Sequence, residues 1–128
     1  GIVAKDFALR LTSQNEINSK LWDSLNDHFP RATLLGITDG IRGSWIQEEK
    51  GAIFHQPAYL INSVLDTTGC GDAYHGAFLS GILKNMTTQE CAKTASAAGA
   101  LNSIKIGGRG NLCDANEIET FLKSAQEI

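Results

Sequence analysis

The apolar residues between positions 15 and 29 recur every three or four residues, which is the spacing of one face of an α-helix. They are Ile17, Leu21, Trp22, Leu25 and Phe29. Pro30 follows them and cannot continue a helix, because it lacks an N–H group and its ring clashes with the preceding turn. The pattern therefore predicts an amphipathic helix over residues 15–29 whose apolar face belongs to the core.

Short apolar runs elsewhere in the first half of the chain indicate strands. Residues 1–4 indicate the end of a strand, which a short helix at 5–11 follows. Residues 32–38 are apolar almost without interruption, as in a strand that is buried on both faces. Three further extended runs follow, and the first two predict a hairpin around a Glu-Lys-Gly turn: 44–48, 52–55 and 59–65.

A helix with glycines in its body is predicted over residues 73–83. An interior glycine costs about 1 kcal/mol relative to alanine. Gly76 and Gly81 are therefore expected where this helix packs closely against another element.

The next helix begins at Thr87, which is expected to form a capping box with Glu90, and it ends near Ile104. One side of this helix consists of small residues, namely Ala92, Ala95, Ser96, Ala97, Ala98, Gly99 and Ala100. Such a surface admits the close approach of another helix or of a flat ligand, and both alternatives stay open. A last helix is predicted from its cap at Asp114 to about Gln126.

Composition limits the classes of protein. The chain has 128 residues, of which 42% are hydrophobic, enough for one core and too few for two comfortable domains. Its net charge of -3 provides no basic surface for nucleic acid or for an anionic membrane, and no apolar run approaches the length of a membrane span. The three cysteines show no Cys-x-x-Cys spacing, which favours a reducing, cytoplasmic setting over a disulfide framework or a zinc site.

The most informative stretch is residues 66–72, Asp-Thr-Thr-Gly-Cys-Gly-Asp, just before a predicted helix. A helix that opens at Gly69, Cys70 and Gly71 presents unpaired backbone N–H groups, which together with the helix dipole favour an anion. Asp72 then places a carboxylate beside this anion site, as a base does when it takes a proton from a group attacking the anion. The alternative is an ordinary turn in which Asp72 caps the helix.

A second turn with two glycines, residues 39–43, follows the predicted strand at 32–38. Ligand sites in open α/β sheets gather at the carboxyl ends of strands, so this turn is a second candidate contact. Arg109 lies in a glycine-rich loop and is either a phosphate ligand or a solvated side chain.

Two standard nucleotide motifs fail. Residues 76–81 have the glycine spacing of a Walker motif, but Ile82 stands where lysine is required. Residues 69–74 begin like a dinucleotide-binding fingerprint and lack its last small residue. The histidines show no metal-ligand spacing with each other or with the cysteines: His28, His55 and His75.

Residues 66–77, Asp-Thr-Thr-Gly-Cys-Gly-Asp-Ala-Tyr-His-Gly-Ala, closely resemble the signature DTTGAGDxFxGA of the ribokinase-like (PfkB) carbohydrate kinases. Cys70 and Tyr74 replace the usual Ala and Phe, and residues 38–43 are similar to the family's T-x-G-x-x-G. The resemblance implies an α/β fold, a three-layer αβα sandwich whose sheet is incomplete here. Residues 1–128 would be the C-terminal ATP-binding and catalytic part, and the N-terminal substrate and lid part is absent from this chain.

The resemblance also implies a function: transfer of the γ-phosphate of ATP to a hydroxyl of a sugar or sugar-like substrate. Asp72 would deprotonate that hydroxyl, and the amides of Gly69, Cys70 and Gly71 would form the anion hole. Mg²⁺ would travel with ATP. The residues expected to contact ATP are Thr38, Gly40, Gly43, Gly71, Ser96 and Gly99.

A monovalent cation such as K⁺ lies beside the anion hole in many relatives. Asp66 and Thr68 match that position, and the resemblance implies that carbonyls near Asn102, Lys105 and Gly107 complete it.

One departure from the family concerns Ala4 and Phe7, which stand where many members carry an N-x-x-E motif linked to Mg²⁺. Residues 3–8 look more like the ketohexokinase branch, so the resemblance does not name the sugar. The sequence does not begin with Met, and we expect a fragment of a protein that forms a homodimer at full length. The alternative function is a non-catalytic nucleotide-binding or regulatory domain that keeps the fold.

Overall fold

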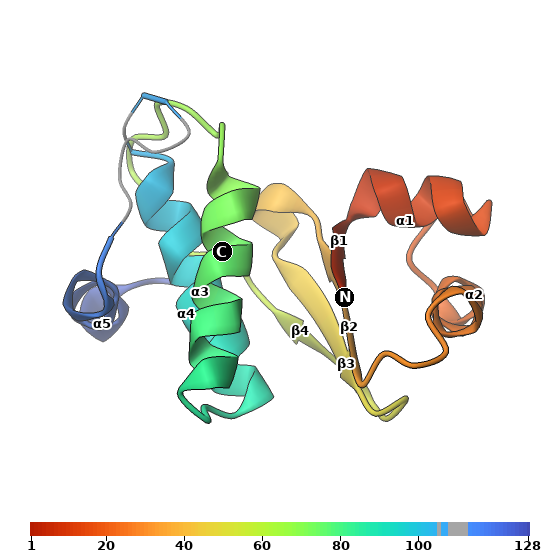
Figure 1. The fold of residues 1–128 in the computed structure, drawn as a ribbon. Helices are drawn as coiled ribbons and strands as arrows, with labels where there is room; N and C mark the ends of the chain where they lie inside the picture. Colours follow the sequence, from red (N-terminus) through yellow and green to blue (C-terminus); the bar gives the residue numbers. More distant parts are fainter. Residues whose placement is uncertain (105, 108–112) are drawn as a thin grey trace.

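The computed structural model describes residues 1–104, 106–107 and 113–128. Its centre is a mixed sheet with strand order β1-β2-β3-β4, in which β1 runs parallel to β2 and the other neighbours are antiparallel (Figure 1). The strands are β1 (Ile2–Ala4), β2 (Leu34–Thr38), β3 (Ser44–Glu48) and β4 (Ile53–Gln56). The predicted hairpin is therefore confirmed as β3 and β4.

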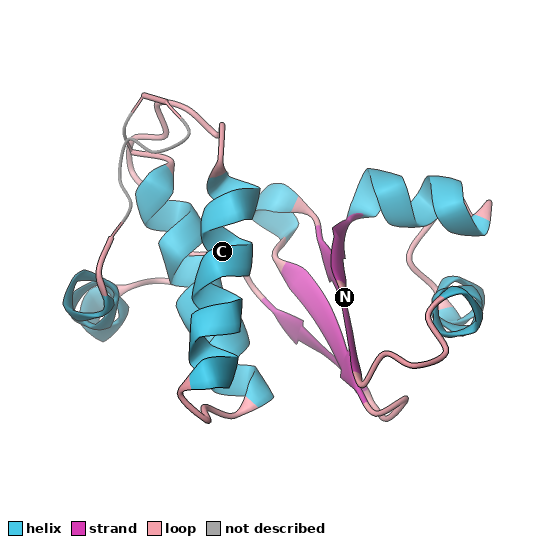
Figure 2. Cartoon of the chain, viewed as in Figure 1, coloured by secondary structure: helices cyan, strands magenta, loops and turns pink. Residues whose placement is uncertain are grey.

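Helices cover both faces of this sheet, with α1 and α2 on one side and α3 and α4 on the other (Figure 2). A short 3₁₀ turn, η1 (Gly40–Arg42), follows β2, and α5 packs against α4. The helices are α1 (Lys5–Thr12), α2 (Ser19–His28), α3 (Cys70–Leu83), α4 (Thr88–Asn102) and α5 (Ala115–Ser124). The expected three-layer α/β arrangement is confirmed.

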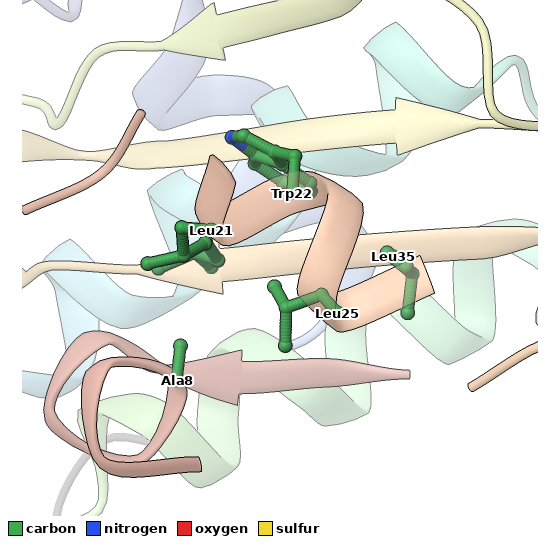
Figure 3. Close-up of a cluster of buried hydrophobic side chains, with 6 residues drawn as sticks. Ala8, Leu21, Trp22, Leu25 and Leu35 are labelled. Carbon is green, nitrogen blue, oxygen red and sulfur yellow. The ribbon is translucent and has the colours of Figure 1, made fainter. Parts of the chain in front are cut away.

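Large apolar side chains fill the layer between the sheet and α1 and α2. Successive residues of a strand point to opposite faces, and Leu35 and Ile37 of β2 face this side. They join Leu21, Trp22 and Leu25, the apolar stripe expected for α2, and Ala8 of α1 in one buried cluster (Figure 3). The helix begins four residues later than predicted, because the side chain of Asn18 accepts a hydrogen bond from the Leu21 N–H and caps it there.

Small residues dominate the opposite layer, where Ala92, Ala95 and Cys91 of α4 pack against α3 and the sheet. A Cβ atom on Gly81 would lie 2.7 Å from the Cys91 sulfur, so the packing explanation for this glycine holds. It fails for Gly76, where a Cβ would meet nothing within 4 Å. The alanines on the small side of α4, Ala92, Ala95, Ala97 and Ala98, are thus buried against other parts of the protein, whereas a ligand contact at Ser96 and Gly99 stays a prediction.

The capping box of α4 is present, with Glu90 N–H donating to the Thr87 hydroxyl and Thr87 N–H donating to the Glu90 carboxylate. Both helices next to the site differ at their ends from the prediction. α3 begins at Cys70, three residues early, because the glycine turn itself starts the helix, and α4 ends at Asn102.

The predicted strand over residues 59–65 is wrong. Among the described residues, Tyr59 alone of this run makes a β-bridge, to Glu127, and the rest of the run is irregular. Its backbone donors pair instead with scattered carbonyls, Leu60 N–H with Gln126 and Leu65 N–H with Ser103. The apolar run had suggested a buried strand, yet Val64 and Leu65 are 55% and 60% exposed. No helix in the described ranges is long and apolar enough to cross a membrane.

Candidate active site

The start of α3 is shaped by Gly69, the N-cap residue, whose φ of 78° lies in the left-handed region that glycine adopts at no steric cost. The Ala73 N–H donates to the Gly69 carbonyl at 2.9 Å and forms the first bond of the helix. The Cys70 N–H donates backward to Thr67 at 3.2 Å. Of the three amides expected in the anion hole, the Cys70 amide therefore has an internal partner, and those of Gly69 and Gly71 are the better placed to meet an anion.

Asp72 is the third residue of α3 and is exposed to solvent. Its side chain lies at the wall of a cavity of about 490 Å³ between α3, α4 and α5. None of Thr38, Gly43 or Ser96 lines this cavity, so the expected nucleotide contacts lie elsewhere.

The second glycine turn follows directly from the end of β2 at Thr38. Gly40 belongs to η1 with a φ of 52°, and Gly43 ends the turn with a φ of 88°. A Cβ atom on Gly43 would collide with the carbonyl oxygen of Gln56 and lie 3.0 Å from the Pro57 Cα. Glycine is therefore required at position 43, because the turn is pressed against the segment after β4.

Two positive side chains flank this turn. Asp39 accepts a hydrogen bond from Lys5 at 3.0 Å and lies 3.5 Å from the Arg42 guanidinium. Lys5 follows β1 and Asp39 follows β2, and the carboxyl ends of parallel strands meet at one edge of a sheet. Lys5 was not among the residues expected at the site, although its place after a predicted strand was a usable signal. The turn thus carries one net positive charge, which suits an anionic ligand.

Helix α4 connects this turn to the anion site. The Ser96 hydroxyl donates to the Pro57 carbonyl at 3.2 Å, and Pro57 is one of the residues that pack against Gly43. One turn further on, a Cβ atom at Gly99 would lie 3.4 Å from the Cys70 carbonyl oxygen, so this part of α4 touches the start of α3. The structure thus brings Ser96 near one glycine turn and Gly99 near the other.

Asn102 takes the next step along α4, three residues after Gly99. Its side-chain Nδ2 donates to the Thr68 carbonyl at 3.0 Å and lies 3.6 Å from the Cys70 sulfur. The sequence had indicated only backbone carbonyls near this position. The side-chain contact carried no local signal, since Asn102 and Thr68 are 34 residues apart.

Asp66 is held by two backbone amides: Oδ1 accepts from the Thr68 N–H at 2.8 Å and Oδ2 from the Gly107 N–H at 2.9 Å. These bonds, the Gly107 bond first, favour the charged carboxylate and lower the pKa of Asp66 below its usual value. The backbone N–H groups of Leu65 and Asp66 both donate to the Ser103 carbonyl. The segment before the turn at Gly69–Gly71, called the anion turn below, is therefore tied to the end of α4.

The oxygen atoms on Asp66, in the loop after it and at the end of α4 are of the kind that bind a monovalent cation, and such a cation stays a prediction. They comprise the Asp66 carboxylate, the Thr68 carbonyl with a second lone pair, and the buried Asn102 Oδ1, which has no hydrogen-bond partner in the part of the chain that the structure describes. Hard cations prefer such ligands. The calls on Lys105 and Arg109 lie outside the described residues.

The positions that carry the Mg²⁺-linked N-x-x-E motif in many family members offer no metal ligand here. Ala4 ends β1 and Phe7 is 48% exposed on α1, and neither side chain offers a ligand. In the described ranges no group of three or more His, Cys, Asp and Glu side chains could hold a metal ion.

Residues 8–113 match the family model described as pfkB family carbohydrate kinase, so the chain belongs to that family. It is similar to an uncharacterized sugar kinase of Dictyostelium discoideum, with 37% identity over 66% of this chain and 24% of the relative. A 5-dehydro-2-deoxygluconokinase of Bacillus subtilis is 29% identical over 87% of this chain and 34% of its own length. The chain thus spans about a quarter to a third of these relatives.

Solved structures support the same fold. The structure of an Arabidopsis thaliana ribokinase complexed with ribose and ATP matches 95% of this chain and 40% of its own, with a TM-score of 0.85 and 22% identity. The chain therefore has the ribokinase-type fold over nearly its whole length, and the neighbour extends well beyond it.

Proposed function

We propose that this chain is the C-terminal ATP-binding and catalytic part of a kinase that phosphorylates a hydroxyl of a sugar or sugar-like substrate. The observation that carries the proposal is the start of α3, where Gly69 and Gly71 offer N–H groups at a helix N-terminus and Asp72 lies within the same turn. The names of the relatives, which are sugar kinases, support the substrate class.

In this proposal the Asp72 carboxylate takes the proton of the attacking hydroxyl. The hydroxyl oxygen forms a bond to the γ-phosphorus as the bond between that phosphorus and the β,γ-bridging oxygen breaks, and ADP leaves with the electron pair. The N–H groups of Gly69 and Gly71 stabilise the negative charge on the transferring group, and Cys70 N–H contributes only by sharing its bond to Thr67.

ATP would extend from the anion turn toward the second glycine turn. Thr38, Gly40 and Gly43 would contact its phosphates and ribose, and the ATP found in the Arabidopsis ribokinase structure supports a nucleotide here. Ser96 and Gly99 would lie on the α4 side of the nucleotide. The positive charges of Lys5 and Arg42 beside Asp39 favour an anionic ligand at this edge of the sheet.

Two ions belong to the proposal. Asp66, Thr68 and Asn102 would hold a monovalent cation, whose positive charge would favour an anion at the neighbouring turn. Mg²⁺ would be carried by the ATP phosphates. The N-terminal substrate and lid part, the homodimer and the cytoplasmic location stay predictions.

The decisive experiment is Asp72→Asn in the natural full-length protein. Removing a general base typically costs 10²–10⁴-fold in rate, so we expect kcat to fall by about a thousandfold while the Kd for ATP, measured by calorimetry, changes little. Glu117→Gln is a matched control, since Glu117 is likewise an acidic residue in the first turn of a helix, α5, and lies far along the chain.

Two results would contradict the proposal. Unchanged turnover in the Asp72→Asn protein would show that Asp72 is not the general base. ATP binding without a phosphorylated product from any sugar in a panel would favour the alternative, a non-catalytic nucleotide-binding domain.

A further inference from the structure

Asn102 is a polar side chain in an unusual place. It is the last residue of α4, it is 0% exposed, and it is among the largest fully buried side chains. Burying an amide costs free energy unless its groups are hydrogen-bonded. Only one end of this amide is satisfied, because Oδ1 has no hydrogen-bond partner within the described residues. An apolar residue would fill this position at lower cost, so each end of the amide needs a role. Oδ1 has one in the proposed cation site, and Nδ2 needs one of its own.

The polar contacts of the Asn102 amide nitrogen reach the anion turn and the loop that leads to it. Its Nδ2 donates to the Thr68 carbonyl at 3.0 Å and lies 3.6 Å from the Cys70 sulfur. A carbonyl oxygen only accepts hydrogen bonds, so the amide nitrogen must face Thr68. The neighbouring Ser103 behaves differently: its hydroxyl donates to Ala100 of the same helix end, at 2.6 Å.

Apart from backbone bonds such as Cys70 N–H to Thr67 and Ala73 N–H to Gly69, the anion turn has few restraints in the described ranges. Gly69 and Gly71 carry no side chains that could pack, and a Cβ at Gly71 would meet nothing within 4 Å. Glycine also loses more backbone freedom on ordering than any other residue. The peptide groups of Thr68 are instead held by side chains on both sides, its N–H by Asp66 Oδ1 and its C=O by Asn102.

The arrangement of the helices makes this contact possible. α3 begins and α4 ends on the same side of the molecule (Figure 1). The small residues between the two helices, with Gly99 at the Cys70 carbonyl, let the end of α4 come close to the loop.

We propose that Asn102 is a positioning residue that orders the anion turn by holding the Thr68 carbonyl. It keeps the N–H groups of Gly69 and Gly71 in place before an anion arrives, which is the preorganisation that transition-state stabilisation requires. The catalytic consequence rests on the proposed function, whereas the ordering of the turn does not.

The ordering is tested by amide hydrogen exchange on the natural full-length protein with Asn102→Ala and Asn102→Val. Neither side chain has a hydrogen-bond donor, and valine fills the space that alanine leaves empty. Losing one buried hydrogen bond corresponds to about a tenfold change. We expect the Thr68 and Cys70 amides to exchange about tenfold faster in both variants, with the Phe78 amide in the body of α3 unchanged. Ser103→Ala, the matched control, should stay within about twofold of the wild type.

The outcomes are separable. Unchanged exchange at Thr68 and Cys70 overturns the proposal, and so does an equal increase at Phe78, because Asn102 would then support the whole α3–α4 core. In both Asn102 variants kcat should also be about tenfold lower, with the KM for ATP unchanged. A general loss of folded protein would not produce this split, because the rates are normalised to the number of active sites. If the wild type phosphorylates nothing, the proposed function fails while the exchange result still decides the role of Asn102.

Discussion

The two helical layers of this protein are built in opposite ways. On the side of α1 and α2, the large side chains of Leu21, Trp22 and Leu25 fill the space above the sheet. On the side of α3 and α4, alanines, Gly81 and Cys91 let the helix backbones approach each other. The first layer stabilises the fold by burying large apolar side chains, and the second by close contact between helices. The anion turn lies at the start of α3, where the close packing of this second layer brings the end of α4 within hydrogen-bonding distance of the loop before the turn.

The largest effect is expected from removing volume in the first layer. Leu25 is 1% exposed, and Leu25→Ala should lower the free energy of unfolding by about 2–5 kcal/mol, measured by urea denaturation. Leu25→Met keeps the volume and should cost less than about 1.5 kcal/mol. Equal costs for the two variants would show that this layer does not depend on volume.

The second glycine turn should break when a side chain is added. Gly43→Ala combines a φ of 88° with a collision at the Gln56 carbonyl, so we expect a loss of at least about 2 kcal/mol and weaker ATP binding by calorimetry. Gly40→Ala is the control, because its φ of 52° is accessible at about 1 kcal/mol and a Cβ there meets nothing within 4 Å. If both variants lost a similar amount of stability, the contact of Gly43 with the Gln56 carbonyl would not explain the effect.

In the second layer we expect the opposite dependence: adding side-chain volume should lower stability, whereas in the first layer removing it does. Gly81→Ala places a Cβ 2.7 Å from the Cys91 sulfur, and overpacking should outweigh the gain in helix propensity by about 1 kcal/mol. Gly76→Ala meets no neighbour and should raise the free energy of unfolding by up to about 1 kcal/mol. Thermal unfolding of the pair gives the sign of each change, and a stabilising Gly81→Ala would contradict this account.

The smallest effect concerns Asp66. Because its folded pKa lies below the unfolded value of about 3.8, its carboxylate stabilises the fold fully above that pH, and the contribution disappears as pH falls through the folded pKa. Asn at this position cannot accept from both Thr68 N–H and Gly107 N–H. We therefore expect Asp66→Asn to be less stable than the wild type at pH 7 and the difference to shrink below about pH 4. A difference that is constant with pH would show that these bonds do not act through the charge.

Local signals predicted much of the fold. The apolar stripe of α2, the Thr87 capping box and the hairpin of β3 and β4 all depend on residues close together in the chain, so pattern alone identified them. The run 59–65 misled because apolar composition does not say whether a neighbouring strand is present to pair with it.

The candidate site divides along the same line. The sequence by itself determined the turn at Gly69–Gly71, the position of Asp72 and the family, because each is encoded in a few consecutive residues. Only the tertiary structure decided that Lys5 meets Asp39 and that Asn102 holds the Thr68 carbonyl. Those pairs are each 34 residues apart, and long-range contacts leave no periodic trace in a sequence. Close packing of small residues, rather than any motif, is what brings the end of α4 to the anion turn.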